Sequence, residues 1–158
     1  MNANQFTQKS MEAVQAAQAL AVRNYHQQIE QIHFLAALLE QENGLIPQLL
    51  KRMNKTPESL DAAVQEQIRR LPAVTGSGRE ADKVYITRAL DQVFTHAETL
   101  ASSMKDEFVL VEHLFLALLT CPDSTLERIF DAYRLDKESI LHALQSVRGN
   151  QRVTTDNP

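Results

Sequence analysis

The chain has few of the residues that many functional sites require. Its 158 residues include a single cysteine, Cys121, and only four glycines. A lone cysteine cannot form an internal disulfide bond, so we expect a cytoplasmic protein. The glycines Gly44, Gly76, Gly78 and Gly149 do not have the spacing of a phosphate-binding loop, so no nucleotide is expected to bind in that way.

Other absences exclude further classes of function. The chain has no Cys-x-x-Cys or His-Glu-x-x-His motif, so we expect no metal site. No apolar run approaches membrane-spanning length, and the first residues lack the pattern of a signal peptide. The net charge of −4 and the isoelectric point of about 5.7, without a basic stripe, argue against nucleic acid as a partner.

The dominant feature that is present is an internal repeat. The segment HFLAALL at residues 33–39 returns as HLFLALL at residues 113–119, a shift of 113 − 33 = 80 residues. The same shift pairs Thr7 with Thr87 and Ile29 with Val109, without a gap. The chain is therefore predicted to be a tandem duplication of one helical unit.

Helical periodicity is clearest near the start of the second repeat. Apolar residues recur there at steps of three and one, which predicts one buried stripe on an amphipathic helix. The stripe consists of Ile86, Ala89, Leu90, Val93, Phe94, Ala97, Leu100, Ala101 and Met104. Thr7 and Thr87 precede this helix and its twin in repeat 1, so each is predicted to be an N-cap.

Three more helices are predicted in each repeat. The second is expected at residues 30–41 and 112–120, and the third at residues 46–53 and 126–133. The fourth begins after the caps Thr56, which is followed by Pro57, and Asp136, and Gly149 is expected to stop the last helix. No stretch alternates with period two, so the fold class is all-α, with eight helices as a pseudo-twofold tandem repeat of two four-helix units.

The expected domain organisation follows from the repeat. Residues 1–148 form one domain, with repeat 1 at about 6–70, a hinge at 71–85 and repeat 2 at about 86–148. The first half of the hinge contains Pro72, Gly76 and Gly78, and these residue types favour a connecting segment over a helix. Residues 149–158 are polar and aperiodic, which is typical of a tail or linker.

Several residues could carry chemistry. His33 and His113 begin equivalent helices, where an imidazole is expected to bond the main chain, although a metal ligand is the alternative. An enzyme would have to use Cys121 as a nucleophile or Asp106 and Glu112 as an acid–base pair. The cysteine lacks an activating neighbour, and acidic residues near helix starts serve as caps or dipole partners, so no catalytic residue is assigned.

The two repeats differ just before their second helix. Phe108, Leu110 and Val111 are apolar where residues 28, 30 and 31 of repeat 1 are polar. These side chains either pack against the other repeat and the hinge or form an exposed apolar patch that binds peptide.

These segments together resemble a known family. Phe6-Thr7, the run IHFLAALL at residues 32–39, LPAVTGSG at 71–78 and VRGNQRV at 147–153 are similar to the Clp N-terminal domain. That domain is the double four-helix module at the front of the Clp/Hsp100 AAA+ unfoldases. The resemblance covers residues 4–148 and is strongest to the ClpB type, the disaggregases.

The resemblance implies a non-catalytic domain that recognises substrate. It implies that the domain binds unfolded or aggregated polypeptide in an apolar groove and delivers it to the ATP-driven translocating ring. The implied partners are unfolded or aggregated proteins and the rest of the AAA+ hexamer, with neither nucleic acid nor membrane, and the isolated domain is expected to be a monomer. No cofactor is expected in this domain, whereas the parent protein would use ATP.

The resemblance also implies a set of peptide-binding residues. The seven positions are Thr7, Phe94, Leu100, Asp106, Phe108, Leu110 and Glu112. One rival is a ClpA- or ClpC-type domain that docks an adaptor protein, although repeat 1 has Ile32-His33 where the ClpC type has Glu-His. A second rival interpretation is a free-standing structural repeat protein.

Overall fold

A computed structural model of the chain describes residues 1–75 and 83–148. Their elements follow the repeat. The first unit contains the 3-10 helix η1 (Ala3–Gln5), α1 (Gln8–Arg23), β1 (Gln28–Ile29), α2 (Gln31–Glu40), α3 (Leu45–Arg52) and α4 (Pro57–Arg70). The second contains β2 (Tyr85–Ile86), α5 (Arg88–Ser103), α6 (Val111–Thr120), α7 (Ser124–Ala132) and α8 (Lys137–Arg148).

The predicted duplication is confirmed within these residues. Helices α1 and α5, α2 and α6, and α4 and α8 begin 80 residues apart, because their first residues are 8 and 88, 31 and 111, and 57 and 137. The left-handed turns repeat as well, since Tyr25 and Lys105 both have φ of 62°. A single inserted residue would rotate every later helical face by about 100°, so this constant shift keeps the buried faces of the two units equivalent.

The predicted helix caps are mostly confirmed. Ser10 donates its main-chain N–H to Thr7 Oγ1 (3.2 Å), and Leu90 donates to Thr87 Oγ1 (3.1 Å). Asp136 accepts a bond from the main chain of Ser139 (2.8 Å). Thr56 is the N-cap of α4, but its side chain makes no capping bond, and Pro57 in the first turn supplies the start signal instead. The expected stop at Gly149 lies outside the described residues.

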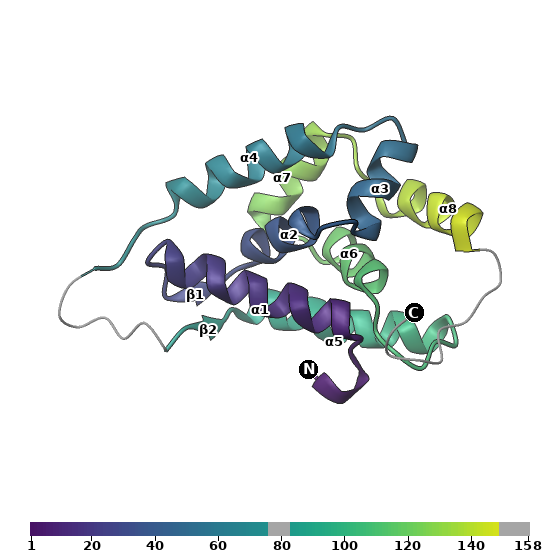
Figure 1. Ribbon diagram of the computed structural model, residues 1–158, viewed down its shortest axis with the longest axis horizontal. Helices are drawn as coiled ribbons and strands as arrows, with labels where there is room; N and C mark the ends of the chain where they lie inside the picture. Colours follow the sequence, from purple (N-terminus) through teal and green to yellow (C-terminus); the bar gives the residue numbers. More distant parts are fainter. Residues whose placement is uncertain (76–82, 149–158) are drawn as a thin grey trace.

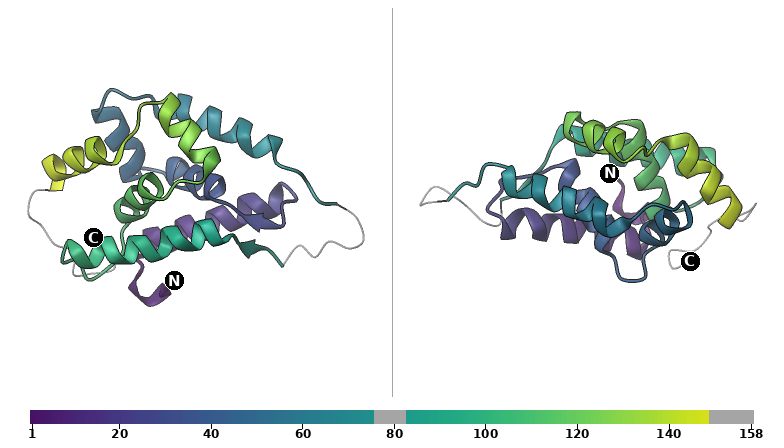
Figure 2. Two further views of the ribbon diagram at one scale, coloured as in Figure 1. Left: turned by 180° about the vertical axis from the view of Figure 1, so that it is seen from behind. Right: turned by 90° about the horizontal axis from the view of Figure 1, so that it is seen from above.

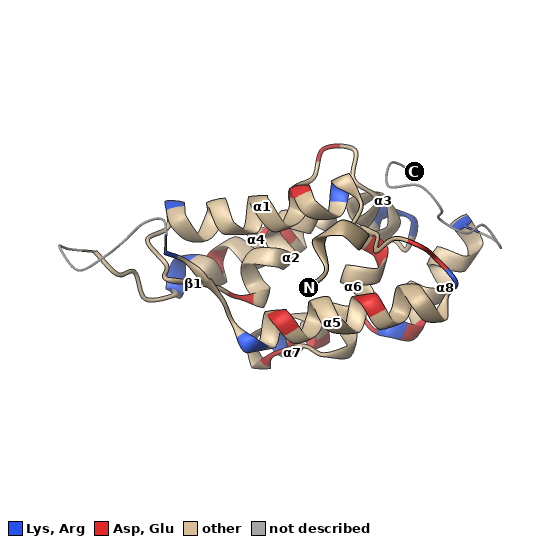
Figure 3. Ribbon diagram, turned by 90° about the horizontal axis from the view of Figure 1, so that it is seen from below, with Lys and Arg blue, Asp and Glu red and all other residues tan. Residues whose placement is uncertain are grey.

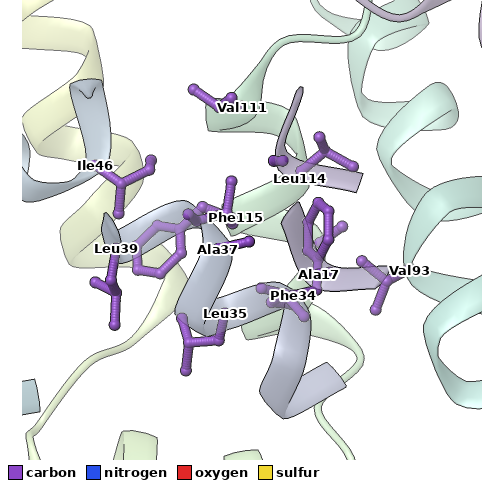
Figure 4. Packing of buried hydrophobic residues seen from close by; sticks show 14 of the residues in the cluster. Ala17, Phe34, Leu35, Ala37, Leu39, Ile46, Val93, Val111, Leu114 and Phe115 are labelled. Atoms are coloured by element: carbon purple, nitrogen blue, oxygen red, sulfur yellow. The ribbon is translucent and has the colours of Figure 1, made fainter. Parts of the chain in front are cut away.

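The helices form three layers with α2 and α6 in the middle. Figures 1 and 2 show α1 and α5 on one side of this pair and the remaining helices on the other. Figure 4 shows how Phe34 and Leu35 of α2 pack with Leu114 and Phe115 of α6 at the centre of the core. Apolar residues cover every face of these two helices, which is why both can be buried between the other layers.

The two repeats exchange short extended segments, which the helical reading of the sequence did not include. Residues of β1 pair in parallel with β2, so that Ile29 lies opposite Ile86. At the equivalent place in the other repeat, Phe6 forms a parallel bridge with Val109. The segment that leads each repeat thus pairs with the loop before the second helix of the other repeat. The shared core positions Ile29 and Val109 are both buried, as predicted.

Gln31 links the repeats through three main-chain bonds. It is buried at the start of α2, and its Nε2 donates to the carbonyl groups of Ala89 (3.1 Å) and Cys121 (2.9 Å). Its Oε1 accepts the N–H of Asp123 (2.8 Å). The equivalent residue in repeat 2 is Val111, so this connection has no counterpart there.

We expect the change Gln31→Val to lower the free energy of unfolding by about 2 kcal/mol, because it leaves three part-buried main-chain groups without their partner. Urea unfolding followed by circular dichroism measures this loss. Gln18→Val, on the exposed face of α1, is the matched control and should cost about 0.5 kcal/mol through helix propensity alone. Equal losses in the two variants would contradict the bridging role of Gln31.

Candidate functional site

His113 organises the start of α6 in repeat 2. Leu110 donates its main-chain N–H to His113 Nδ1 (2.9 Å), so the ring proton is on Nε2. Nε2 lies 2.9 Å from Asp106 Oδ2 and donates to it. Burial lowers the pKa of His113 to about 4, although the carboxylate of Asp106 acts in the opposite direction. The ring is therefore neutral, and protonating Nδ1 would break the bond that caps the helix.

His33 has the same role in repeat 1 with a different partner. Its Nδ1 accepts the main-chain N–H of Glu30 (2.9 Å), and its Nε2 lies 2.9 Å from Nδ1 of His26. Burial, followed by the proximity of His26, lowers the pKa of His33 to about 4. His26 also bonds the main chain of Leu71, where the hinge begins. The prediction that both imidazoles bond the main chain at a helix start is confirmed.

An ion cluster joins the end of α8 to the loop before α6. The Arg148 guanidinium contacts Asp106 Oδ1 through Nη2, and its Nη1 lies 3.4 Å from Glu112 Oε2. The Asp106 side chain is fully buried and that of Glu112 nearly so, whereas the Arg148 side chain is 12% exposed. Burial raises the pKa of Glu112, and Arg148 opposes that rise. Figure 3 shows the acidic positions of the α5–α6 loop and α6 at the end of the molecule where α8 lies.

Thr7 bonds the α5–α6 loop and not the ion cluster. Its main-chain N–H donates to the carbonyl of Val109 (3.1 Å), which also accepts the hydroxyl of Ser10 (2.8 Å). Thr7 is buried and caps α1. The structure thus brings two of the three predicted polar residues together through Arg148, a connection that the sequence did not reveal. Thr7 instead ties the main chain of Val109, which lies between Asp106 and Glu112 in sequence, to the first repeat.

The predicted apolar site residues divide into two pairs. Leu100 and Phe108 are half-buried and reach the surface. Phe94 is 0% exposed and packs edge-on against Phe6 (6.0 Å between ring centroids) and Phe34 (5.3 Å). Leu110 is 7% exposed. Of the two alternatives left open for Leu110, the structure therefore favours packing over an exposed patch, and Phe94 is part of the core between α1, α2 and α5.

An apolar surface lies at the opposite end of the molecule. It includes Ile86, which was predicted to begin the buried stripe of a helix but lies exposed in β2, before α5 begins. We call Tyr25, Val74, Tyr85 and Ile86 the hinge-end surface. Tyr85 is 65% and Tyr25 49% exposed, and the other two are also exposed. Main-chain bonds hold these residues together, since Val74 donates to Tyr25 (2.8 Å) and Tyr85 donates to Gln27 (3.1 Å). The β-branched and aromatic run at residues 84–87 is the signal that could have indicated this strand.

A cavity of about 490 Å³ opens beside the hinge-end surface. The lining combines apolar, amide and charged side chains and consists of His26, Gln27, Gln28, Glu30, Leu71, Pro72, Val74, Lys83 and Tyr85. Burial raises the pKa of Glu30. The cavity therefore offers apolar contact together with hydrogen-bonding groups.

The described residues offer neither a metal site nor a membrane-spanning helix. Within residues 1–75 and 83–148, no three histidine, cysteine, aspartate or glutamate side chains are placed to hold a metal ion. In the same part of the chain, no helix has both the length and the apolar character needed to cross a membrane.

Comparisons with known proteins agree with this architecture. The family described as Clp repeat (R) N-terminal domain matches residues 5–133. The chaperone protein ClpB of Bacillus anthracis is 41% identical over 158 residues, which is 100% of this chain and 18% of the relative. The chain thus spans less than a fifth of the length of that relative.

Solved structures share the fold. The Hsp104 N-terminal domain from Candida albicans has a TM-score of 0.82 and 24% identity, covering 96% of each chain. A complex of the ClpV N-domain with a VipB peptide has a TM-score of 0.64 and 20% identity, covering 89% of each chain. Domains of this family are not catalytic, which agrees with the prediction that this one is not an enzyme. The family match over residues 5–133 and the similarity to ClpB over the whole chain show that this chain belongs to the Clp repeat N-terminal domain family.

Proposed function

We propose that the chain is the substrate-recognition domain of a ClpB-type disaggregase. In this proposal it binds unfolded or aggregated polypeptide and delivers it to an ATP-driven hexameric ring formed by the rest of the protein, in the cytoplasm. The similarity to ClpB over the whole chain, which makes up 18% of that relative, supports this role. The domain itself needs no cofactor for it, because binding and release of polypeptide require only surface contacts.

The observation that carries the proposal is the hinge-end surface. Among the described residues, six large apolar side chains are exposed, and four of them form this surface. Unfolded polypeptide differs from folded protein in presenting apolar side chains to solvent. Burying one such side chain contributes about 1.5–3 kcal/mol before ordering costs. A small apolar surface therefore supports weak binding that tolerates many sequences, as a domain that must release its substrate requires.

The residues implied by the family resemblance form a second proposed contact surface. It lies at the end of α5, in the α5–α6 loop and at the start of α6, and we call it the N-terminal end. Leu100 and Phe108 are the two that reach solvent, beside the carboxylates of Asp106 and Glu112. We propose that Leu100 and Phe108 contact polypeptide, and that Asp106 and Glu112, which are buried, act on it through Arg148, the part-exposed side chain that they hold. The buried residues Thr7, Phe94 and Leu110 support the loop and the helix that position them.

Adaptor docking is the rival function. It is favoured by the ClpV N-domain, a structural neighbour that was solved with a VipB peptide. That complex supports protein binding by domains of this fold in general. A docked adaptor is a folded partner with a fixed sequence, whereas a disaggregase substrate is unfolded, so the two functions differ in the partner that binds.

The test is binding of a fluorescently labelled, reduced and carboxymethylated polypeptide, which cannot fold. We expect the 158-residue chain to bind it and the double change Tyr85→Thr with Ile86→Thr to weaken binding about tenfold, or about 1.4 kcal/mol. Threonine is β-branched and favours extended strands, so the fold should be retained.

Val147→Thr, which removes an exposed apolar side chain from α8, is the matched control and should bind as the unchanged chain does. Phe108→Gln measures the contribution of the N-terminal end separately. If the unchanged chain binds no unfolded polypeptide, the proposed function is wrong. If the Tyr85/Ile86 variant binds unfolded polypeptide as tightly as the unchanged chain does, the hinge-end surface is not the binding surface.

A further inference from the structure

The outer edge of β2 carries main-chain groups that the fold does not use. In the parallel pairing with β1, Tyr85 donates its main-chain N–H to the carbonyl of Gln27 (3.1 Å). Thr87 donates in the same way to Ile29 (3.1 Å). Successive residues of a strand direct their N–H and C=O groups to opposite sides, so those of Ile86 point away from β1. Among the residues that the structure describes, neither group of Ile86 has a hydrogen-bond partner. Figure 1 shows β2 at the rim of the molecule, beside β1.

The equivalent position in repeat 1 is closed by the chain itself. That position is Phe6, since 86 − 80 = 6, and its main-chain N–H donates to the carbonyl of Ala3 in η1 (3.1 Å). The Phe6 side chain is 4% exposed, whereas that of Ile86 is 39% exposed. One repeat therefore pairs the N–H and buries the side chain at this position, and the other leaves both open to a partner.

Val109 shows how one residue of this fold holds an extended segment. It donates its N–H to the carbonyl of Gln5 (2.7 Å) and accepts the N–H of Thr7 (3.1 Å), which makes the parallel bridge to Phe6. Ile86 offers the same pair of groups, one donor and one acceptor. An open strand edge is a template for another chain, and the addition of a peptide strand to such an edge is a known mode of recognition. The complementary partner is thus an extended main chain.

The charges beside β2 favour a segment of another polypeptide over a second copy of this chain. Lys83 and Arg88 flank the strand, and both are exposed. If two β2 strands paired along this edge, these like charges would approach one another, which destabilises a strand pair. Charged side chains at an edge strand are a common means by which folded proteins avoid such pairing.

We propose that an extended segment of a bound polypeptide adds to the outer edge of β2 as a third strand, held by the N–H and C=O of Ile86. This inference rests on the proposed function and specifies how substrate binds at the hinge-end surface. Tyr85 and Ile86 point to opposite faces of the strand, so they contact apolar side chains on the two faces of the added segment. Every residue except proline carries a main-chain N–H, so this mode accepts many sequences. Folded proteins use these groups in their own helices and sheets, so the same mode selects unfolded polypeptide.

The first experiment measures hydrogen exchange of the Ile86 amide by NMR in the unchanged chain. In the free chain this amide should exchange rapidly, whereas the amides of Tyr85 and Thr87 should be protected by their bonds to β1. The probe is a short blocked peptide in which valine and threonine alternate between two terminal glutamates. Saturation with it should slow exchange at Ile86 about tenfold or more.

An unchanged exchange rate at Ile86 in the saturated complex would overturn the proposal. Protection that rises with the concentration of the chain alone, without peptide, would assign the edge to a second copy and would overturn it as well. If the proposed function fails, the unchanged chain binds neither the peptide nor the carboxymethylated polypeptide. If only this inference fails, the chain binds both and the Ile86 amide stays unprotected.

A pair of variants separates the main chain from the side chain. Ile86→Thr and Ile86→Pro both remove the apolar side chain, but only proline also removes the N–H. Proline is tolerated on an edge strand where the N–H faces away from the neighbouring strand, so both variants should fold. We expect Ile86→Pro to bind the peptide about tenfold more weakly than Ile86→Thr does. Equal affinities of the two folded variants would contradict strand addition, and the exchange measurement decides if the proline variant does not fold.

Discussion

Acidification from about pH 7 to about pH 4.5 is expected to lower the free energy of unfolding by about 5 kcal/mol, which is a large part of the total stability of a domain of this size. The cause is the pair of buried imidazoles, His33 and His113. Burial lowers the pKa of each to about 4 from an ordinary value of 6.5. Each ring is neutral in the folded chain and uses Nδ1 to accept the N–H that begins its helix.

The direction of the effect follows from proton binding. Between about pH 6.5 and pH 4 the unfolded chain binds protons at these two positions and the folded chain does not, so stability falls as the pH falls. The stability that the two neutral imidazoles contribute is fully present above the pKa that they have in the unfolded chain. At about pH 4.5 each imidazole accounts for a loss of about 2.5 kcal/mol. Burial raises the pKa of Glu112, which acts in the opposite direction and offsets part of this loss.

Urea unfolding at a series of pH values measures this loss. His33→Gln should flatten the pH dependence by about half, because glutamine at the third helical position can accept the same N–H without titrating. A pH profile that is flat between about pH 6.5 and pH 5 in the unchanged chain would contradict the assignment of neutral, capping imidazoles.

The local features of the fold could be predicted because they depend on residues close in sequence. Thr7, Thr87 and Asp136 were identified as caps, and the apolar steps of α5 placed Leu90, Val93 and Ala97 on its buried face. The 80-residue register follows from the same periodicity applied twice. Sequence also identified His33 and His113 as residues that bond the main chain, because equivalent helices begin with the same residue type.

Contacts between distant segments could not be predicted from these patterns. The bridge of Phe6 to Val109 and the pairing of β1 with β2 are exchanged between repeats, and a two-residue strand is too short to show alternation. Arg148 reaches Asp106 across 42 residues. The difference between Leu110 and Phe108 is of the same kind, since both are apolar in sequence and only the packing around the loop decides which one reaches solvent.

Phe94→Ala is expected to lower the free energy of unfolding by about 3–5 kcal/mol, because it removes a fully buried aromatic ring and leaves a cavity. The family resemblance implies that Phe94 lines a peptide groove, in which case its loss would weaken binding and leave stability unchanged. The geometry instead places its ring edge-on between Phe6 and Phe34, at the layer where α1, α2 and α5 meet. Removing the ring therefore disturbs both repeats at once.

Phe108→Ala removes the same side chain from a half-buried position and provides the matched control. We expect it to cost about 1 kcal/mol, since less of the ring leaves solvent on folding. Its effect on binding of unfolded polypeptide can then be measured on a folded domain. Similar unfolding free energies for the two variants would place Phe94 at the surface and contradict its role in the core. Because the two changes are chemically identical, a difference in stability between them can come only from the surroundings of each ring.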